Sequence, residues 1–155
     1  MISTLIYSSD SLISNTDPDF EFAIEKIRAE SQLRNDREGI TGFLFYFENK
    51  FVQILEGDFE PVTSLFASIR RDRRHSKPRI IWFSENEERA FDDWSLDSSM
   101  AYIAKNHREV SVKLSFLTRF ISDTSQQHIK LRDLLVDIAQ AMRRRREFPM
   151  PRRVA

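Results

Sequence analysis

Residues 40–57 read ITGFLFYFENKFVQILEG, and this stretch decides the fold. Two apolar runs, Ile40–Phe47 and Phe51–Glu56, flank the short polar segment Glu48–Lys50. Runs of this length, rich in aromatic and β-branched residues and joined by a few turn residues, predict a β-hairpin. Both faces of the two strands are apolar, so we expect the sheet that contains them to be covered on both sides.

The segments around the hairpin extend it to the order β-α-β-β-α-β. Ile2–Ser8 alternates between two faces and predicts a strand. Asp17 and Pro18 then predict a helix start, as N-cap and first helical residue. The other expected elements are the end of that helix within 35–39, a second amphipathic helix over 60–71, and strands over 79–83 and 97–103.

This order is typical of an α+β, ferredoxin-like fold, with a five-stranded mixed sheet and two helices on one face. Two further segments with helical spacing predict a C-terminal two-helix extension, against the back of the sheet or against a second subunit. We expect a domain over 1–103, a helical extension over 104–146 and a flexible tail over 147–155. The apolar residues of the extension are Val110, Leu114, Leu117, Ile121, Leu131, Leu134, Leu135, Ile138 and Met142.

Composition excludes several classes of function. Twenty-four basic and 24 acidic residues give no net charge, which argues against nucleic acid or a membrane surface as the main partner. The absence of cysteine excludes thiol catalysis and Cys-ligated zinc. His107 and His128 lie far in sequence from any carboxylate cluster, so we expect no metal site. The start of the chain has no basic run before a long apolar stretch, so we expect no signal peptide and a cytoplasmic location.

Gln53 is the unusual residue of the hairpin, because apolar residues flank it on both sides. A buried carboxamide has donors and an acceptor that cost stability when they are unpaired. By alternation, Tyr7 on a neighbouring strand is expected to point to the same face. Two interpretations stay open: a structural Tyr–Gln pair satisfied by backbone and water, or a pair that also binds a polar ligand.

Four more residues are expected around the space between the sheet and its two helices. Asn35 is either a C-cap or turn residue, or it directs its amide into this space together with Ser31, one turn earlier. Ile27 and Ile69, on the inner faces of the two helices, are either core residues or the walls of a flat slot.

Five short motifs follow one another along the chain: Leu5-Ile6-Tyr7-Ser8-Ser9, Asn35-x-x-x-Gly39-Ile40-Thr41-Gly42, Phe51-Val52-Gln53-Ile54-Leu55-Glu56-Gly57, Arg71-Asp72-Arg73-Arg74-His75 and Phe91-x-x-Trp94-Ser95. Together they resemble the BLUF family, blue-light sensors that use flavin. The resemblance covers residues 1–103 in the family's order and spacing. Its most specific part is F-x-Q-x-L-E-G after an I-T-G turn.

The resemblance implies a photoreceptor of the short type without a fused effector domain, and not an enzyme. It implies bound FAD, with FMN and riboflavin as alternatives. The flavin ring would lie between the two helices, walled by Ile27 and Ile69, and Asn35 would bond the carbonyl and N–H edge of its pyrimidine side. Further flavin contacts are implied for Ser31, Phe51, Asp72, Arg74 and His75.

The resemblance also implies a photoactive pair, Tyr7 and Gln53. The phenol would donate an electron and then a proton to the excited flavin, and recombination would leave Gln53 rotated or tautomerised, with a small red shift. Trp94 and Leu96 would transmit the signal, and the sequence leaves open whether Trp94 lies in or out of the pocket. Leu96 stands where the family usually has Met, and Arg34 where many members have a second Asn.

The helical extension over 104–146 is expected to serve output or dimerisation. We expect a homodimer or higher oligomer and a separate effector, either a phosphodiesterase or a transcription regulator. Two other classes share the predicted fold. One is an RNA-recognition module, which needs exposed aromatic residues beside basic ones on the central strands. The other is a ferredoxin-like domain that binds a small metabolite. Both of these proteins would be colourless, whereas a flavin-binding sensor is yellow.

Overall fold

One five-stranded sheet forms the centre of the computed structural model, which describes residues 1–97, 108–122 and 131–145. The strand order is β4-β1-β3-β2-β5. Strands β2 and β5 pair in parallel and the other neighbours are antiparallel, which confirms the expected mixed sheet. The strands are β1 (Ile2–Ser11), β2 (Thr41–Phe47), β3 (Lys50–Gly57), β4 (His75–Asn86) and β5 (Trp94–Asp97).

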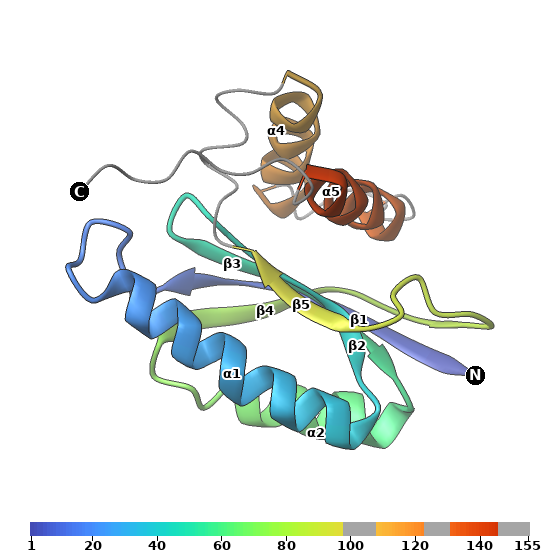
Figure 1. Ribbon diagram of the computed structural model, residues 1–155. Coiled ribbons are helices and arrows are strands. Elements are labelled where there is room, and N and C mark those ends of the chain that lie inside the picture. The colour runs from blue at the N-terminus through green and yellow to red at the C-terminus, as the bar shows by residue number, and fades with distance from the viewer. Residues whose placement is uncertain (98–107, 123–130, 146–155) are drawn as a thin grey trace.

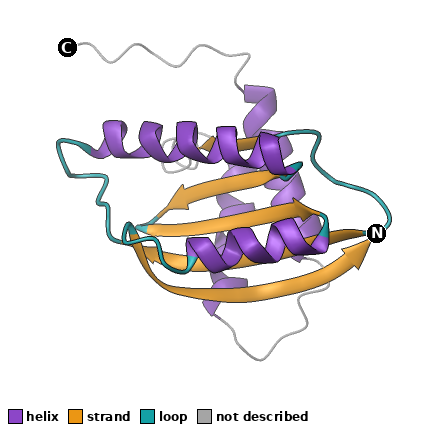
Figure 2. Cartoon of the chain, turned by 90° about the horizontal axis from the view of Figure 1, so that it is seen from below, coloured by secondary structure: helices purple, strands orange, loops and turns teal. Residues whose placement is uncertain are grey.

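Helices cover the sheet on both faces (Figure 1). Helices α1 (Phe20–Glu38) and α2 (Phe59–Ile69) lie on one face, side by side in the view of Figure 2. Helices α4 (Arg108–Ser122) and α5 (Leu131–Arg145) lie on the other. The ferredoxin-like fold with a C-terminal pair behind the sheet is therefore confirmed. None of these described helices has the length and apolar character needed to cross a membrane.

Strand β3 separates two hydrophobic cores. Its residues Phe51 and Leu55 pack with α1 and α2, whereas Val52 and Ile54 pack with α4 and α5. A strand covered on both faces is apolar on both, which explains the nearly continuous hydrophobic run. The same burial makes the RNA-recognition alternative wrong, because the aromatic side chains of the central strands are not exposed.

Both N-terminal helices differ from their expected bounds by a few residues. Helix α1 begins at Phe20, two residues after Pro18, because a turn in which the Phe20 N–H donates to the Asp17 carbonyl comes first. Asp19, and not Asp17, is the N-cap. Helix α2 ends at Ile69, two residues early, where the backbone tightens into a turn.

The hairpin loop is shorter than expected, because Lys50 belongs to β3 and pairs with Phe47. The loop therefore has two residues, Glu48 and Asn49, with φ of 50° and 57°. Two successive residues with a left-handed backbone form a tight turn whose twist matches the twist of the two strands that it joins.

Strands β4 and β5 also depart from their expected bounds. Strand β4 extends over His75–Asn86 and contains Pro78, which an edge strand tolerates at a bulge in its pairing with β1. Strand β5 begins at Trp94, three residues early, because its parallel pairing with β2 starts there, at Gly42. The expected continuation to residue 103 and the tail over 147–155 lie outside the described residues.

Candidate functional site

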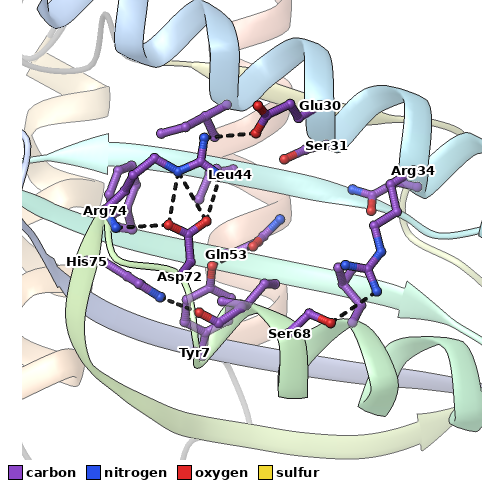
Figure 3. Close-up of a pocket in the computed structure, with 15 residues that line it drawn as sticks. Tyr7, Glu30, Ser31, Arg34, Leu44, Gln53, Ser68, Asp72, Arg74 and His75 are labelled. Carbon is purple, nitrogen blue, oxygen red and sulfur yellow. Dashed lines mark hydrogen bonds and ion pairs between the residues drawn. The ribbon is translucent and has the colours of Figure 1, made fainter.

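A cavity of about 180 Å³ lies between the sheet and helices α1 and α2 (Figure 3). Tyr7 and Gln53 form part of its floor, and Ile27 and Ile69 line it from the two helices. The structure brings together all ten residues expected at the site: Tyr7, Ile27, Ser31, Asn35, Phe51, Gln53, Ile69, Asp72, Arg74 and His75. The other lining residues are Glu30, Arg34, Leu44, Leu65 and Ser68.

Tyr7 and Gln53 face each other across neighbouring strands, as Cα partners of β1 and β3. The Tyr7 hydroxyl donates a hydrogen bond of 2.6 Å to Gln53 Oε1. Each residue is 3% exposed. No described residue accepts a hydrogen bond from Gln53 Nε2, so this donor is left to whatever occupies the cavity.

The Tyr7 phenol keeps its proton. Burial raises the pKa of Tyr7 far above its ordinary value, and the negative charge of Asp72 raises it further. The ring is held by Phe66, whose centroid lies 5.3 Å away. Tyr7 is therefore a neutral O–H donor at neutral pH.

Asn35 is 1% exposed, and neither Nδ2 nor Oδ1 has a hydrogen-bond partner among the described residues. Its backbone carbonyl accepts from the Ile40 N–H at 2.9 Å, at the end of α1. Asn35 lies inside α1, whose C-cap is Gly39, so the interpretation as a C-cap or turn residue is wrong. The side chain lines the cavity, as the other interpretation expects. An unpaired buried amide costs about 1–3 kcal/mol, which a ligand with an adjacent acceptor and donor would recover.

Arg74 bridges the rim of the cavity. Its Nη2 donates to Asp72 Oδ2 at 2.6 Å, and its Nη1 donates to Glu30 Oε2 on α1 at 3.0 Å (Figure 3). Burial tends to raise the pKa of Asp72, but the hydrogen bonds from Arg74 outweigh it and hold that pKa below its ordinary value. The described residues contain no group of three or more metal-ligating side chains placed to hold an ion.

His75 connects the end of α2 to β1. Its Nε2 lies 2.6 Å from the Ile69 carbonyl oxygen and therefore donates to it, while Nδ1 lies 2.7 Å from Ser9 Oγ. The ring makes edge contacts with Tyr7 and Phe51, at centroid distances of 6.3 and 6.4 Å. Both ring nitrogens are thus occupied, and His75 positions the aromatic floor of the cavity.

The family model for BLUF, described as sensors of blue light using FAD, matches residues 2–97. This chain belongs to the BLUF family. It is a member of a family of flavin-binding blue-light sensors, a sensory rather than a catalytic domain. The residues of the cavity fit a flavin, because the unpaired amide of Asn35 supplies a donor and an acceptor for the pyrimidine edge, and the apolar side chains of Ile27 and Ile69 line the cavity from the two helices.

Some similar proteins are much longer than this chain, and others have about the same length. The β subunit of a photoactivated adenylate cyclase from Euglena gracilis is 31% identical over 99 residues, which is 63% of this BLUF chain and only 11% of that protein. The dark-state structure of BlrB, a BLUF protein, has a TM-score of 0.66 at 26% identity, covering 90% of this chain and 96% of that one. A bacterial light-regulated adenylyl cyclase has a TM-score of 0.57 at 25% identity. The match covers 99% of this chain and 38% of that one.

One row of Cα partners crosses the BLUF sheet from the floor of the cavity to its edge. Gln53 is paired with Leu44 of β2, and Leu44 with Leu96 of β5. Trp94 is 1% exposed and does not line the cavity; it packs in the core beneath α1 and α2. The structure thus places Trp94 out of the pocket and Leu96 one strand away from the cavity-lining Leu44.

Sequence reasoning missed several lining residues. Glu30 and Ser68 are ordinary polar residues of α1 and α2 and give no local signal. Arg34 stands out only as a departure from the family; its Nη2 donates to Ser68 Oγ at 3.3 Å and its Nε to Glu38 Oε1 at 3.2 Å. Leu44 could have been found, because alternation along β2 puts it on the same face as Tyr46.

Proposed function

We propose that this BLUF chain is a blue-light receptor, and not itself an enzyme, in which light changes the hydrogen bonds of Gln53. The observation that carries the proposal is the 2.6 Å bond from Tyr7 to Gln53 Oε1 in the floor of the cavity, with Nε2 left to the occupant. A location in the cytoplasm stays a prediction from the sequence.

The flavin is held, in this proposal, by the residues that line the cavity. Asn35 bonds the pyrimidine edge, Ile27 and Ile69 contact the ring faces, and Asp72 and Arg74 contact the ring edge or ribityl chain. Ser31, Phe51 and His75 complete the site. We take FAD as the cofactor from the family description, with FMN and riboflavin as the alternatives to be tested.

A bound flavin supplies absorption of blue light and, when excited, a strong one-electron oxidant. The neutral phenol of Tyr7 is the group of the floor that can lose an electron and a proton, and its proton already lies in a hydrogen bond to Gln53. Once that bond is disturbed, the Gln53 amide can rotate or tautomerise, which changes the hydrogen-bonding group presented to the cavity. Such an exchange is worth about 1 kcal/mol per bond, enough to bias a nearly balanced switch.

The proposal is tested by the colour of the protein. Purified protein supplied with excess FAD is expected to be yellow and to show a small, reversible red shift of its flavin absorption under blue light. Protein that stays colourless, or a flavin spectrum that illumination leaves unchanged, would contradict the proposal.

Replacing Asn35 with Leu is expected to stabilise the flavin-free protein by about 1 kcal/mol, because it removes two buried unpaired groups. The same change is expected to weaken flavin binding about tenfold, the equivalent of about 1.4 kcal/mol. Urea unfolding of the apoprotein and fluorescence titration with FAD measure the two effects. The control is Gln32→Leu, an amide on α1 that instead bonds Asp36; a destabilised Asn35→Leu apoprotein with unchanged affinity would make Asn35 a structural group.

Output is proposed to pass through α5, which holds a buried carboxylate of the sheet. Glu56 of β3 is 0% exposed, and its Oε1 accepts from Arg132 Nη2 at 3.1 Å and Nε at 3.3 Å. Its Oε2 accepts from the backbone N–H groups of Ala90 and Phe91 at 2.8 and 3.2 Å. One carboxylate thus joins α5, β3 and the segment that leads into β5.

Arg143, near the end of α5, contacts the strand that carries Trp94. It forms an ion pair with Asp93 and donates to Ser95 Oγ at 3.3 Å, so that it bonds the residues on both sides of Trp94. Its guanidinium also lies 6.0 Å from the ring centroid of Phe43. A displacement of β5 would therefore be transmitted directly to α5.

Arg143→Gln is expected to leave the flavin red shift unchanged and to reduce the light-induced change in amide hydrogen exchange of α5 at least about threefold. The reason is that the variant loses the ion pair to Asp93 but no group of the cavity. Mass spectrometry of amide hydrogen exchange, carried out in darkness and in light, measures this change in α5. Arg144→Gln, an exposed neighbour, is the matched control; an equal response of both variants would remove Arg143 from the output route.

We propose that the helical extension over 104–146 contacts a partner, either a second copy of the chain or a separate effector. Val112 and Phe116, one turn apart on α4, are 48% and 51% exposed, which supports a contact surface there. The cyclase domains named in similar proteins support an enzyme as effector. A phosphodiesterase and a transcription regulator stay predictions, tested by comparing partner binding in darkness and light.

A further inference from the structure

Three large apolar side chains are exposed together where α2 meets the edge strand β4. Phe59, the first residue of α2, is 55% exposed, and Ile80 and Phe83 of β4 are 47% and 40% exposed. The rings of Phe59 and Phe83 contact each other, with centroids 6.0 Å apart. Ile80 pairs with Tyr7 of β1 and Phe83 pairs with Leu5, so both side chains lie on the face of the sheet that α1 and α2 cover. We call Phe59, Ile80 and Phe83 the α2–β4 surface.

Helix α2 and strand β4 lie side by side in opposite directions, as contacts at both ends show. At one end Phe59, at the start of α2, contacts Phe83, near the end of β4. At the other end His75, at the start of β4, donates from Nε2 to the carbonyl of Ile69, the last residue of α2, at 2.6 Å. The pair of elements therefore has two distinct ends, about 16 Å apart along the 11 residues of the helix.

The two ends carry opposite charge. Asp58 and Glu60 stand at the start of α2, and Glu85 stands near the end of β4. Arg70 and Arg71 follow the last residue of α2, at the other end. All five are exposed, and none of them forms an ion pair within the part of the chain that the structure describes. One end is thus acidic and the other basic.

Two of these charges lie on the same side of their elements as the exposed rings. The backbone of Arg70 is still helical, with φ of −59° and ψ of −22°. Eleven residues of α-helix make about three turns, so Arg70 is on the same side of α2 as Phe59. Side chains of a strand alternate between faces, and the pairing of this part of β4 with β1 is regular, so Glu85 points to the same face as Phe83.

A second copy of the chain has the chemistry that this surface needs. In a two-fold contact both copies use the same surface, and one copy is reversed relative to the other. Arg70 of one copy then meets the acidic end of the other, where Glu85 supplies a carboxylate and the two exposed rings supply aromatic faces. A guanidinium binds to both kinds of group. Ile80, between the two ends, meets its equivalent in the other copy.

Direct pairing of two β4 edges is disfavoured. Pro78 has no N–H to donate, Lys77 has a left-handed backbone with φ of 51°, and the pairing of β4 with β1 is shifted at two places. Such interruptions are typical of edge strands that do not extend a sheet. We therefore expect side chains to make the contact, and its small extent favours a weak, reversible dimer.

We propose that the α2–β4 surface binds a second copy of the chain in a two-fold contact, with Arg70 of each copy against Glu85 and the exposed rings of the other. None of these residues lines the cavity, so the inference goes beyond the proposed function and needs no bound flavin. Val112 and Phe116 of α4, on the opposite face of the sheet, then remain available to an effector (Figure 1). The competing explanation is purely structural, because acidic residues at the start of a helix and basic ones at its end interact favourably with the helix dipole.

The test measures the dissociation constant of the dimer for the full chain in darkness, by sedimentation velocity. For the unaltered protein we expect a value between about 1 and 100 µM, as for a small transient contact. Glu85→Arg and Arg70→Glu are each expected to weaken the dimer at least about tenfold, because each sets like charges against each other twice in a two-fold contact. Val112→Ser/Phe116→Ser, on α4, is expected to leave the dimer unchanged.

Mixing the two charge variants gives the sharpest result. A dimer of one Glu85→Arg copy and one Arg70→Glu copy has an arginine against a glutamate in both contacts, so we expect affinity within about threefold of the unaltered protein. The matched control mixes Glu85→Arg with Arg119→Glu. Arg119 is exposed on α4, so the net charges are the same as in the first mixture, but one of the two contacts still holds two arginines. With a fluorescent label on the Glu85→Arg copy, we expect the control mixture to bind at least about threefold more weakly than the first mixture.

Four other outcomes overturn the inference. Unaltered protein that stays monomeric at about 1 mM leaves the surface to a different partner. A dimer that is lost in Val112→Ser/Phe116→Ser but kept in both charge variants places the second copy on α4. Equal recovery in the two mixtures reduces the effect to general attraction between opposite net charges. A lower melting temperature of Arg70→Glu with unchanged dimerisation assigns this charge to the helix end alone.

Discussion

Tyr7→Phe is expected to abolish the light-induced red shift while flavin stays bound. The variant keeps the aromatic packing against Phe66 but lacks the hydroxyl, and with it the proton and the hydrogen bond to Gln53 Oε1. Leaving that buried oxygen unpaired costs about 1–3 kcal/mol of stability, which a folded domain of this size tolerates. The measurement is the light-minus-dark absorption spectrum of the variant reconstituted with FAD.

Tyr46→Phe is the matched control for this experiment. Tyr46 is also buried and its hydroxyl also donates a hydrogen bond, to the Ile13 carbonyl at 2.9 Å, but it does not line the cavity. We expect a normal red shift in Tyr46→Phe. A normal photocycle in Tyr7→Phe would show that the phenol is not the photoactive group.

Gln53→Leu is expected to remove the red shift as completely, again with flavin retained. Leucine has a similar volume and suits the buried centre of β3, but it can neither accept from Tyr7 nor present a donor to the cavity. Any remaining electron transfer from Tyr7 would then have no amide to rearrange. The light-minus-dark spectrum measures the effect, and fluorescence titration verifies that flavin binds.

Gln32→Leu, the control already used for Asn35, separates this effect from a general loss of an amide. Gln32 lies on α1 and does not line the cavity. Its variant is expected to have an unchanged difference spectrum. An unchanged spectrum in Gln53→Leu as well would place the spectral change elsewhere in the site.

Alternation along the strands predicted the position of the central pair. It placed Tyr7 and Gln53 on the same face, and the structure pairs them directly across β1 and β3. Helical periodicity placed Ile27 and Ile69 on the inner faces of the two helices, and one of the two interpretations of Asn35 directed its amide into the same space. All three residues line the cavity. Their roles as flavin contacts stay predictions, because no bound flavin is present to test them.

Contacts between distant segments could not be predicted from local patterns. Glu56 is acidic and lies at the end of an apolar strand, where exposure is the ordinary expectation, yet it is buried against Arg132, 76 positions away. Arg143 belongs to an arginine run that reads as a solvated helix end, yet it contacts Asp93. Such pairs depend on how α5 docks onto the sheet, and periodicity gives only the buried face of α5, not its register.

The position of Trp94 was open for a similar reason. Its side chain lies on the cavity side of the sheet, but whether it reaches the cavity depends on how far β5 extends along β2. Parallel pairing starts at Gly42, and Trp94 packs in the core on the side of α1 and α2 without lining the cavity. Leu96, opposite Leu44, is therefore the β5 residue in register with Gln53.

The central claim is that light changes the bonding of the Gln53 amide. The most direct measurement is a light-minus-dark infrared spectrum of FAD-loaded protein in which glutamine carries a ¹³C label at Cδ. We predict a label-sensitive carbonyl band that shifts on illumination in the unaltered protein and in Gln32→Leu, and that is absent in Gln53→Leu. A difference spectrum without any label-sensitive band, in protein that still shows the visible red shift, would contradict the account.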